Sequence, residues 1–170
     1  MKTILGAILV LGLGVGMGRA QGVFGVSLSG SSEVPPSGSS SIGSGSFALS
    51  GDNLTFSITG LLLGTTPTDA GVFGPATPST DGPMIFDLGT PTVTPVGAQN
   101  LISYTGIEAL TPTQASQLEA GDDYENIYTS GYPGGEIRGQ ITLLPEPSSV
   151  SLLLVGAGML WRSRRSQPKP

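Results

Sequence analysis

Apolar and polar residues alternate in short runs after about residue 20, and glycine and serine separate these runs. Such a period of two places one side of a strand on a core and the other side in solvent. Gly51, Asp52 and Asn53 lie between two of the runs and predict a hairpin turn, because these residue types tolerate the backbone angles of tight turns. The apolar positions of the first three runs are Phe24, Val26, Leu28, Phe47, Leu49, Leu54, Phe56 and Ile58.

Four later segments also have the character of strands, namely residues 84–88, 101–104, 124–129 and 136–143. Three segments rich in threonine, proline and serine, at 65–68, 76–83 and 90–97, have no pattern that would bury one face and predict loops. About seven strands is the number expected for a sandwich or a barrel. We therefore predict an all-β fold, a single antiparallel β-sandwich or flattened barrel of about seven strands with one short helix.

The helix is predicted from Pro112 to about Ala120. Thr111 has the residue type of an N-cap, Gln114 completes a capping box, and Gly121 provides the C-terminal stop. A helix of this length is expected to cover one end of the sheet.

Residues 1–20 have the pattern of a secretory signal peptide. Lys2 precedes an apolar run from Ile4 to Met17, and small residues follow near Ala20. We expect signal peptidase to cleave between Ala20 and Gln21. A retained anchor is the weaker alternative, because the run is shorter than the roughly 20 residues of a spanning helix.

The other end of the chain combines a Pro145-Glu146-Pro147 triplet, an apolar stretch over 150–161, and a basic end with Arg162, Arg164 and Arg165. This tripartite segment resembles the PEP-CTERM sorting signal. The resemblance implies that residues 145–170 insert transiently in the inner membrane by their short transmembrane helix and that an exosortase removes them. A plain C-terminal anchor is the alternative, although about twelve apolar residues are short for that purpose.

The remaining body is strongly acidic. Between Gln21 and Pro147 the only basic residue is Arg138, against twelve acidic residues, so this part carries a net charge of −11. Such a surface repels phosphate backbones, which argues against nucleic-acid binding.

The chain contains neither cysteine nor histidine, which removes disulfides, thiolate nucleophiles, imidazole bases and the best nitrogen ligands for zinc. Acids are available in or near loops for glycoside hydrolysis, but no motif brings two of them together. We therefore expect no enzymatic activity and no cofactor, and an envelope hydrolase is the weakest interpretation. The acids concerned are Asp69, Asp81, Asp87 and Glu108.

Three segments in order carry a resemblance to a known family. They are Ser29-Gly30-Ser31-Ser32-Glu33-Val34-Pro35-Pro36, then Gly74-Pro75-Ala76, and then Asn126-Ile127-Tyr128-Thr129 with Pro133-Gly134-Gly135-Glu136-Ile137-Arg138-Gly139-Gln140-Ile141. Together they look like the CHRD domain, named after chordin, over the whole body from 21 to 144. The resemblance implies an extracellular module with no agreed enzymatic activity.

The chain departs from that family at three positions. CHRD domains usually carry two histidines just before Gly-Pro-Ala and a third in the Asn-x-His-Thr segment, whereas this chain has Gly71, Phe73 and Tyr128 there. Metal chemistry of relatives therefore does not transfer, and we expect Phe73 and Tyr128 to touch as an aromatic pair.

Arg138 admits two interpretations. In a strand, Glu136, Arg138 and Gln140 share one face and form a polar strip that could hold a carboxylate or a sugar. Alternatively, Arg138 ties Glu33 or Glu136 into a structural clamp between the first and last strands. We favour the clamp, because the only cation among many carboxylates is expected to contribute more as a partner in an internal ion pair than as an exposed ligand-binding group.

Asp122, Asp123 and Glu125 form the one weak calcium candidate, since calcium takes six to eight oxygen ligands. Their spacing matches no EF-hand loop, and strand alternation turns Glu125 away from its neighbours. We expect a solvated turn and no metal site.

The sequence thus predicts an exported, non-enzymatic protein of the cell surface or extracellular matrix with a structural or adhesive role. Its expected partners are signal peptidase and exosortase during processing, and then extracellular polysaccharide or other surface proteins. The main alternative is a specific extracellular module that binds a protein or a glycan in a groove near Arg138 and Gly74-Pro75.

Overall fold

The structure is a computed structural model, and it describes residues 21–145. The predicted signal peptide and the predicted sorting tail beyond Pro145 lie outside the described residues. Among the residues that are described, no helix is long and apolar enough to cross a membrane.

Ten strands and one α-helix make up this part of the chain, with a single 3-10 turn, η1 (Gly30–Ser32), after the first strand. The strands are β1 (Gln21–Ser29), β2 (Ile42–Ser50), β3 (Asn53–Leu63), β4 (Pro67–Phe73), β5 (Met84–Asp87), β6 (Thr92–Val96), β7 (Gln99–Ala109), β8 (Tyr124–Thr129), β9 (Ile137–Gln140) and β10 (Thr142–Leu143); the helix is α1 (Pro112–Ala120).

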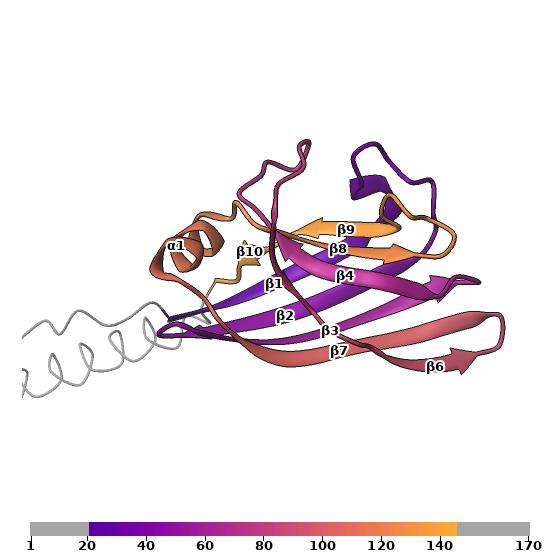
Figure 1. The fold of residues 1–170 in the computed structure, drawn as a ribbon, viewed down its shortest axis with the longest axis horizontal. Coiled ribbons are helices and arrows are strands. Elements are labelled where there is room, and N and C mark those ends of the chain that lie inside the picture. Colours follow the sequence, from indigo (N-terminus) through magenta and orange to yellow (C-terminus); the bar gives the residue numbers. More distant parts are fainter. Residues whose placement is uncertain (1–20, 146–170) are drawn as a thin grey trace, which may run out of the picture.

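The strands form one antiparallel sheet in the order β5-β4-β8-β9-β1-β2-β3-β7-β6, and β10 pairs with β1. The sheet curls into a half-barrel (Figure 1), so that strands far apart in this order meet across the core. The rings of Phe56 on β3 and Phe86 on β5, for example, lie 5.8 Å apart. The apolar positions of the alternating runs, among them Phe24, Leu28 and Ile58, are buried on the inner face.

The predicted all-β class is confirmed, but three details of the strand assignment are wrong. The segments expected to be loops contain β6 and the start of β4, because backbone pairing holds them in the sheet without an apolar alternation. The expected strand over 136–143 is divided into β9 and β10. Strand β7 extends beyond 101–104 in both directions.

The predicted helix is confirmed in detail. The Thr111 hydroxyl accepts a hydrogen bond from the backbone N–H of Gln114, whose side chain accepts in return from the Thr111 N–H. Gly121 ends the helix with a φ of 78°. Figure 1 shows α1 at one end of the sheet. The predicted hairpin between β2 and β3 is present as well, with Gly51 at a φ of 63°.

The outer face of the sheet has two parts. Over β8 and β9 it is covered by the segments 30–41 and 74–83, which bring polar side chains to it. Over β1, β2, β3, β7 and β6 it is open to solvent, and we call this part the open face. The open face includes the hydroxyl positions Ser27, Ser44, Ser46, Thr55, Ser57, Thr59, Thr92, Thr94, Ser103 and Thr105, and the apolar positions Val23, Ile42, Ala48, Leu61, Leu101 and Ile107.

Candidate functional site

Arg138 is the centre of the covered part of the outer face. It lies on β9 between Asn126 on β8 and Ser29 on β1 and is 1% exposed. Its guanidinium donates to Asp81 Oδ1 at 2.6 Å, to the Thr80 carbonyl at 2.6 Å and to the Thr77 carbonyl at 3.2 Å. The buried cation is thereby surrounded by acceptors, as a guanidinium with five N–H donors requires.

The ring of Tyr124 on β8 provides the other wall for this guanidinium. Arg138 Cζ lies 3.5 Å from the ring centroid, which is a cation–π contact. Arg138 is therefore held between a planar ring and three acceptor oxygens, and lysine would reproduce neither the planar stacking on the ring nor the fork of donors.

The partner of Arg138 differs from those expected from the sequence. The ion pair joins it to Asp81 of the 74–83 segment, and neither Glu33 nor Glu136 forms it. The reason is tertiary: the segment 74–83 folds over β9 and delivers Asp81 together with two backbone carbonyls. The clamp consequently joins the last strands to this segment instead of to the first strand.

Glu136 has a different environment, because it precedes β9 and is outside its alternation. It is fully buried, and its carboxylate accepts hydrogen bonds from four hydroxyls. Burial alone would raise its pKa, but these hydrogen bonds lower the pKa below 4.5. The donors are Ser39 at 2.9 Å and Ser41 on Oε1, and Thr65 at 2.6 Å and Thr129 at 2.5 Å on Oε2.

Glu33 directly follows η1 in the 30–41 segment and is 5% exposed. Asn126 Nδ2 donates to its Oε2 at 3.2 Å, while Oε1 has no hydrogen-bond partner. Burial raises the pKa of Glu33 to about 7, against the opposing effects of Asn126 and Arg138. A Cβ on Gly135 would lie 2.6 Å from Oε2, so only glycine allows the carboxyl to sit there.

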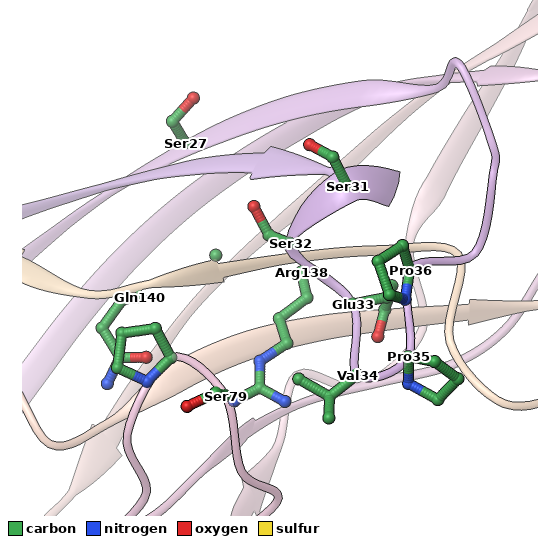
Figure 2. A pocket seen from close by; sticks show the side chains of 12 residues that line it. Ser27, Ser31, Ser32, Glu33, Val34, Pro35, Pro36, Ser79, Arg138 and Gln140 are labelled. Atoms are coloured by element: carbon green, nitrogen blue, oxygen red, sulfur yellow. The ribbon is translucent and has the colours of Figure 1, made fainter.

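A cleft of about 480 Å³ opens beside these residues. Figure 2 shows Gln140 at one end of it and Pro35 and Pro36 at the other, with the Arg138 side chain between them. Gln140 donates to the carbonyls of Ala76 and Gly121, while its Oε1 has no partner. The lining residues are Ser27, Ser31, Ser32, Glu33, Val34, Pro35, Pro36, Pro78, Ser79, Arg138, Gly139 and Gln140.

The three positions where the family resemblance expects histidine lie together on β4 and β8. The predicted contact of Phe73 with Tyr128 is confirmed, with ring centroids 6.0 Å apart in an edge-on arrangement. Phe73 also stacks on Tyr124 at 5.4 Å. Burial raises the pKa of Tyr128 to about 12, and the nearby Tyr124 and Glu33 act in the same direction. Aromatic packing therefore occupies these positions.

The calcium candidates do not converge. Asp122 is exposed, Asp123 is buried beside Gly74, and Glu125 points into the core with Ile127. Within residues 21–145, no three acidic side chains form a group that could hold a metal ion.

The acids considered for hydrolysis are brought together only in part, since Asp69 and Asp87 share a pocket while Asp81 and Glu108 lie elsewhere. Asp81 is engaged by Arg138. Asp69 and Asp87 line a separate pocket of about 280 Å³ beside Tyr104, where each carboxylate accepts a backbone N–H. Glu108 pairs in register with Leu54 on β3, away from that pocket.

Sequence reasoning missed Asp81 as the partner of Arg138 and missed the hydroxyl donors around Glu136. Asp81 is in a segment whose composition indicates only a loop, so no local pattern marks it. The hydroxyls of Ser39, Ser41, Thr65 and Thr129 come from three separate parts of the chain, and nothing in their spacing connects them.

Comparison with known proteins identifies a domain family for most of the described residues. No curated protein and no solved structure matches the chain. The model of the CHRD domain family matches residues 24–141, which are more than half of the sequence. The CHRD domain is a generally extracellular, non-catalytic domain, typical of secreted proteins. The chain therefore belongs to the CHRD domain family.

Proposed function

We propose that this protein is an exported, non-enzymatic component of the cell surface or extracellular matrix with an adhesive, structural role, and that it holds neutral polysaccharide on its open face. In this proposal signal peptidase cleaves before Gln21, and an exosortase cleaves the sorting tail near Pro147. The mature protein is then the described domain.

The observation that carries the adhesive role is the absence of charge from the open face. No acidic or basic residue occupies an outward position of β1, β2, β3, β6 or β7, although residues 21–147 carry a net charge of −11. Hydroxyls of five neighbouring strands stand in one row, in the order Ser27, Ser44, Thr59, Ser103 and Thr92. Adjacent strands are about 4.8 Å apart, so the row repeats at about that interval.

Apolar side chains run beside this row of hydroxyls. A shallow groove of about 330 Å³ is lined by Ile42, Leu61 and Leu101 next to Ser44 and Thr59. Sugar rings combine apolar C–H faces with hydroxyl edges, so alternating apolar and hydroxyl rows match both parts. An uncharged polymer meets no repulsion on this face, whereas an anionic polymer would be repelled by the rest of the domain.

A cleavage test addresses the sorting part of the proposal. The intact mass of the protein is measured separately from the membrane and the extracellular fractions of its native host. An extracellular species beginning at Gln21 and ending near Pro147 supports both processing steps. A membrane species that retains Trp161 and the arginines instead identifies the tail as an anchor.

A sedimentation assay with an insoluble neutral glucan tests the adhesive part. Thr59→Asp introduces a charge in the centre of the open face and should reduce co-sedimentation several-fold. Thr113→Asp makes the same exchange at an exposed position of α1 and should have no effect. Binding should also be unchanged between low and high salt, because no charge takes part.

Two results would contradict the adhesive proposal. One is equal co-sedimentation of both variants and the unchanged protein. The other is a stable dimer that Thr59→Asp dissociates, which would make the open face an interface between two copies of the chain.

A specific binding module remains the second candidate, favoured by the cleft beside Arg138. This cleft is lined by Arg138, Pro78 and Ser79 but not by Gly74 or Pro75, and two of its lining residues, Glu33 and Gln140, contain buried acceptor atoms without partners. A specific module would saturate with one ligand, whereas an adhesive protein binds weakly and broadly.

A further inference from the structure

A second pocket lies where the chain passes from one edge of the curled sheet to the other. Strands β5 and β6 are the two edge strands, and residues 88–91 connect them. The pocket has a volume of about 280 Å³ and is lined by the start of β4, the end of β5, residues 89–91 and Tyr104 of β7. It is separate from both the open face and the cleft beside Arg138.

Two exposed carboxylates share this pocket. Asp87 on β5 pairs in register with Gly71, and Asp69 is two residues before Gly71 on β4, so the two acids are diagonal neighbours on one face. The Cβ atoms of such neighbours lie within about 8 Å of each other, so both side chains can reach one ion. Each acid uses Oδ1 to accept a backbone N–H, from Ala70 at 2.9 Å and from Gly89 at 2.7 Å. Both Oδ2 atoms remain without a partner within residues 21–145.

A buried hydroxyl in the same pocket is an independent indication of a ligand. Tyr104 is 2% exposed, and its hydroxyl has no hydrogen-bond partner among the described residues. The hydroxyl oxygen is nevertheless accessible, so the small exposed part of this side chain opens into the pocket. Burial raises the pKa of Tyr104, and the charges of Glu125, Asp69 and Asp87 act in the same direction, so the group stays neutral. A largely buried hydroxyl without a partner is costly unless a ligand or an ordered water satisfies it.

The charge and the atom types of the pocket select a cation. The lining side chains include two carboxylates and no basic group, and their only polar atoms are oxygens. Arg138, the single basic residue of the body, is engaged by Asp81 outside this pocket. The hydroxyls of Thr68 and Thr90 add two further oxygens at the exposed rim. A set of ligands that consists of oxygen alone is the set that hard divalent cations prefer.

We infer that this pocket binds one calcium ion between Asp69 and Asp87. Their Oδ2 atoms contact the ion at about 2.4 Å, and the Tyr104 hydroxyl hydrogen-bonds to a water molecule of the ion. The volume of about 280 Å³ leaves room for several such waters, since each occupies about 30 Å³ in the liquid. Calcium accepts an irregular set of ligands, whereas magnesium requires a nearly octahedral set and loses its own waters reluctantly. Because two carboxylates contribute and not three, the expected dissociation constant is in the range of extracellular calcium modules, about 0.1–1 mM.

The test is calorimetric titration with calcium chloride. The protein is purified from its native host, freed of metal ions with a chelator and dialysed into about 0.15 M sodium chloride, which screens non-specific attraction to the acidic surface. One calcium ion should bind per chain with a dissociation constant in the range given above. Magnesium chloride should bind at least tenfold more weakly.

Variants assign the binding to this pocket. Asp69→Asn and Asp87→Asn each remove one carboxylate at an exposed position and should weaken calcium binding at least tenfold. Asp122→Asn is the matched control, because it removes an exposed acid from the other acidic segment of the chain. Its affinity for calcium should equal that of the unchanged protein.

Terbium(III) gives a second measurement, which locates the ion beside Tyr104. This ion replaces calcium at oxygen sites and emits light when a neighbouring tyrosine is excited. The emission should be suppressed by excess calcium and should fall several-fold in Tyr104→Phe. Because the Tyr104 hydroxyl has no partner among the described residues, this variant should unfold at the same urea concentration as the unchanged protein.

Four results would overturn the inference. They are no binding of calcium up to about 10 mM, equal affinities for calcium and magnesium, a loss of affinity in Asp122→Asn as large as in Asp69→Asn and Asp87→Asn, and equal terbium emission from Tyr104→Phe and the unchanged protein. None of them affects the proposed adhesive role, which depends on Thr59 and the open face.

Discussion

Glu125 of β8 faces Gly45 of β2 across the core: its Oε2 lies 3.3 Å from the position that a Cβ on Gly45 would occupy. Glu125 is 0% exposed, and neither carboxyl oxygen has a hydrogen-bond partner. The carboxyl is therefore surrounded by apolar groups such as Val26 and Ile58, which lie close to the same point. Burial raises the pKa of Glu125 to about 8, so the group is protonated in the folded protein at neutral pH.

The first prediction concerns the pH dependence of stability. Burial raises the pKa of Glu125 to about 8 and those of Glu33 and Asp123 to about 7, so the folded state binds more protons than the unfolded state above about pH 4.5. Stability then falls as pH rises, by up to about 1.4 kcal/mol per pH unit for each group, until the folded pKa is passed. Glu136 acts in the opposite sense, because its lowered pKa makes stability fall on acidification below its unfolded pKa.

The free energy of unfolding should accordingly be highest near pH 5 and decrease towards pH 8. Urea denaturation at unit pH intervals measures this profile. Glu125→Gln removes one titrating group and should flatten the profile between pH 5 and 8, whereas Glu119→Gln should leave it unchanged. A stability maximum at pH 7 to 8 in the unchanged protein would contradict the burial of these carboxyls.

The second prediction concerns the clamp around Arg138. Asp81→Asn removes a hydrogen bond between charged groups and should destabilise the protein by roughly 1–3 kcal/mol. Arg138→Lys loses the fork of donors and the planar stacking on the Tyr124 ring, so it should cost more, roughly 3–5 kcal/mol. Chemical denaturation of both variants and of their combination measures the coupling. Asp69→Asn, at an exposed position, serves as the control, and losses no larger than that of the control would exclude the clamp.

The third prediction concerns the hydroxyl cage of Glu136. Glu136→Gln replaces one acceptor oxygen by an NH₂ group, which faces hydroxyl donors, and should cost about 2–3 kcal/mol. Ser41→Ala should have a smaller effect, on the order of 1 kcal/mol, and the exposed neighbour Ser40→Ala should have almost none. Thermal denaturation near pH 6 compares the three variants. Equal melting temperatures for Ser41→Ala and Ser40→Ala would show that the cage adds nothing to stability.

The fourth prediction concerns the contact between β9 and β1. A Cβ on Gly139 would lie 2.2 Å from the carbonyl oxygen of Ser27, so Gly139→Ala forces the two strands apart. We expect a loss of about 3 kcal/mol or more. A Cβ on Gly134 would meet nothing within 4 Å, and Gly134→Ala should change stability by less than about 0.5 kcal/mol. Similar urea midpoints for the two variants would contradict the close approach.

Much of the fold follows from local patterns. The strands containing Phe24 and Leu54 are recognisable because one of their faces is buried and the other exposed. The helix is recognisable because Thr111, Gln114 and Gly121 act within a few residues of each other. Strand β6 lacks such a pattern, since all five of its residues are exposed, and the buried residues at the end of β4 are consecutive. Strand β6 and the end of β4 are strands because they pair with neighbouring strands. Pairing with a strand that is distant in sequence produces no pattern in the local sequence.

The candidate site was less accessible from the sequence. The burial of Arg138 could be inferred, because a lone cation among acids finds partners wherever it lies. Its pairing with Asp81 depends on where a loop folds, and a composition of threonine, proline and serine does not determine that. The orphaned Oε1 of Glu33 is likewise a property of three segments together, since Asn126 satisfies one oxygen and Gly135 provides the space.

The pairing of β10 with β1 brings the two ends of the described chain to one corner. Phe24 is opposite Leu143, and the Leu144 N–H donates to the Val23 carbonyl at 2.8 Å. A protease acting just outside this pairing, on either side, would leave every strand pairing of the described sheet intact. The domain can thus be released from, or grafted into, another polypeptide through a single point of attachment, and its cleft and open face would survive the transfer intact.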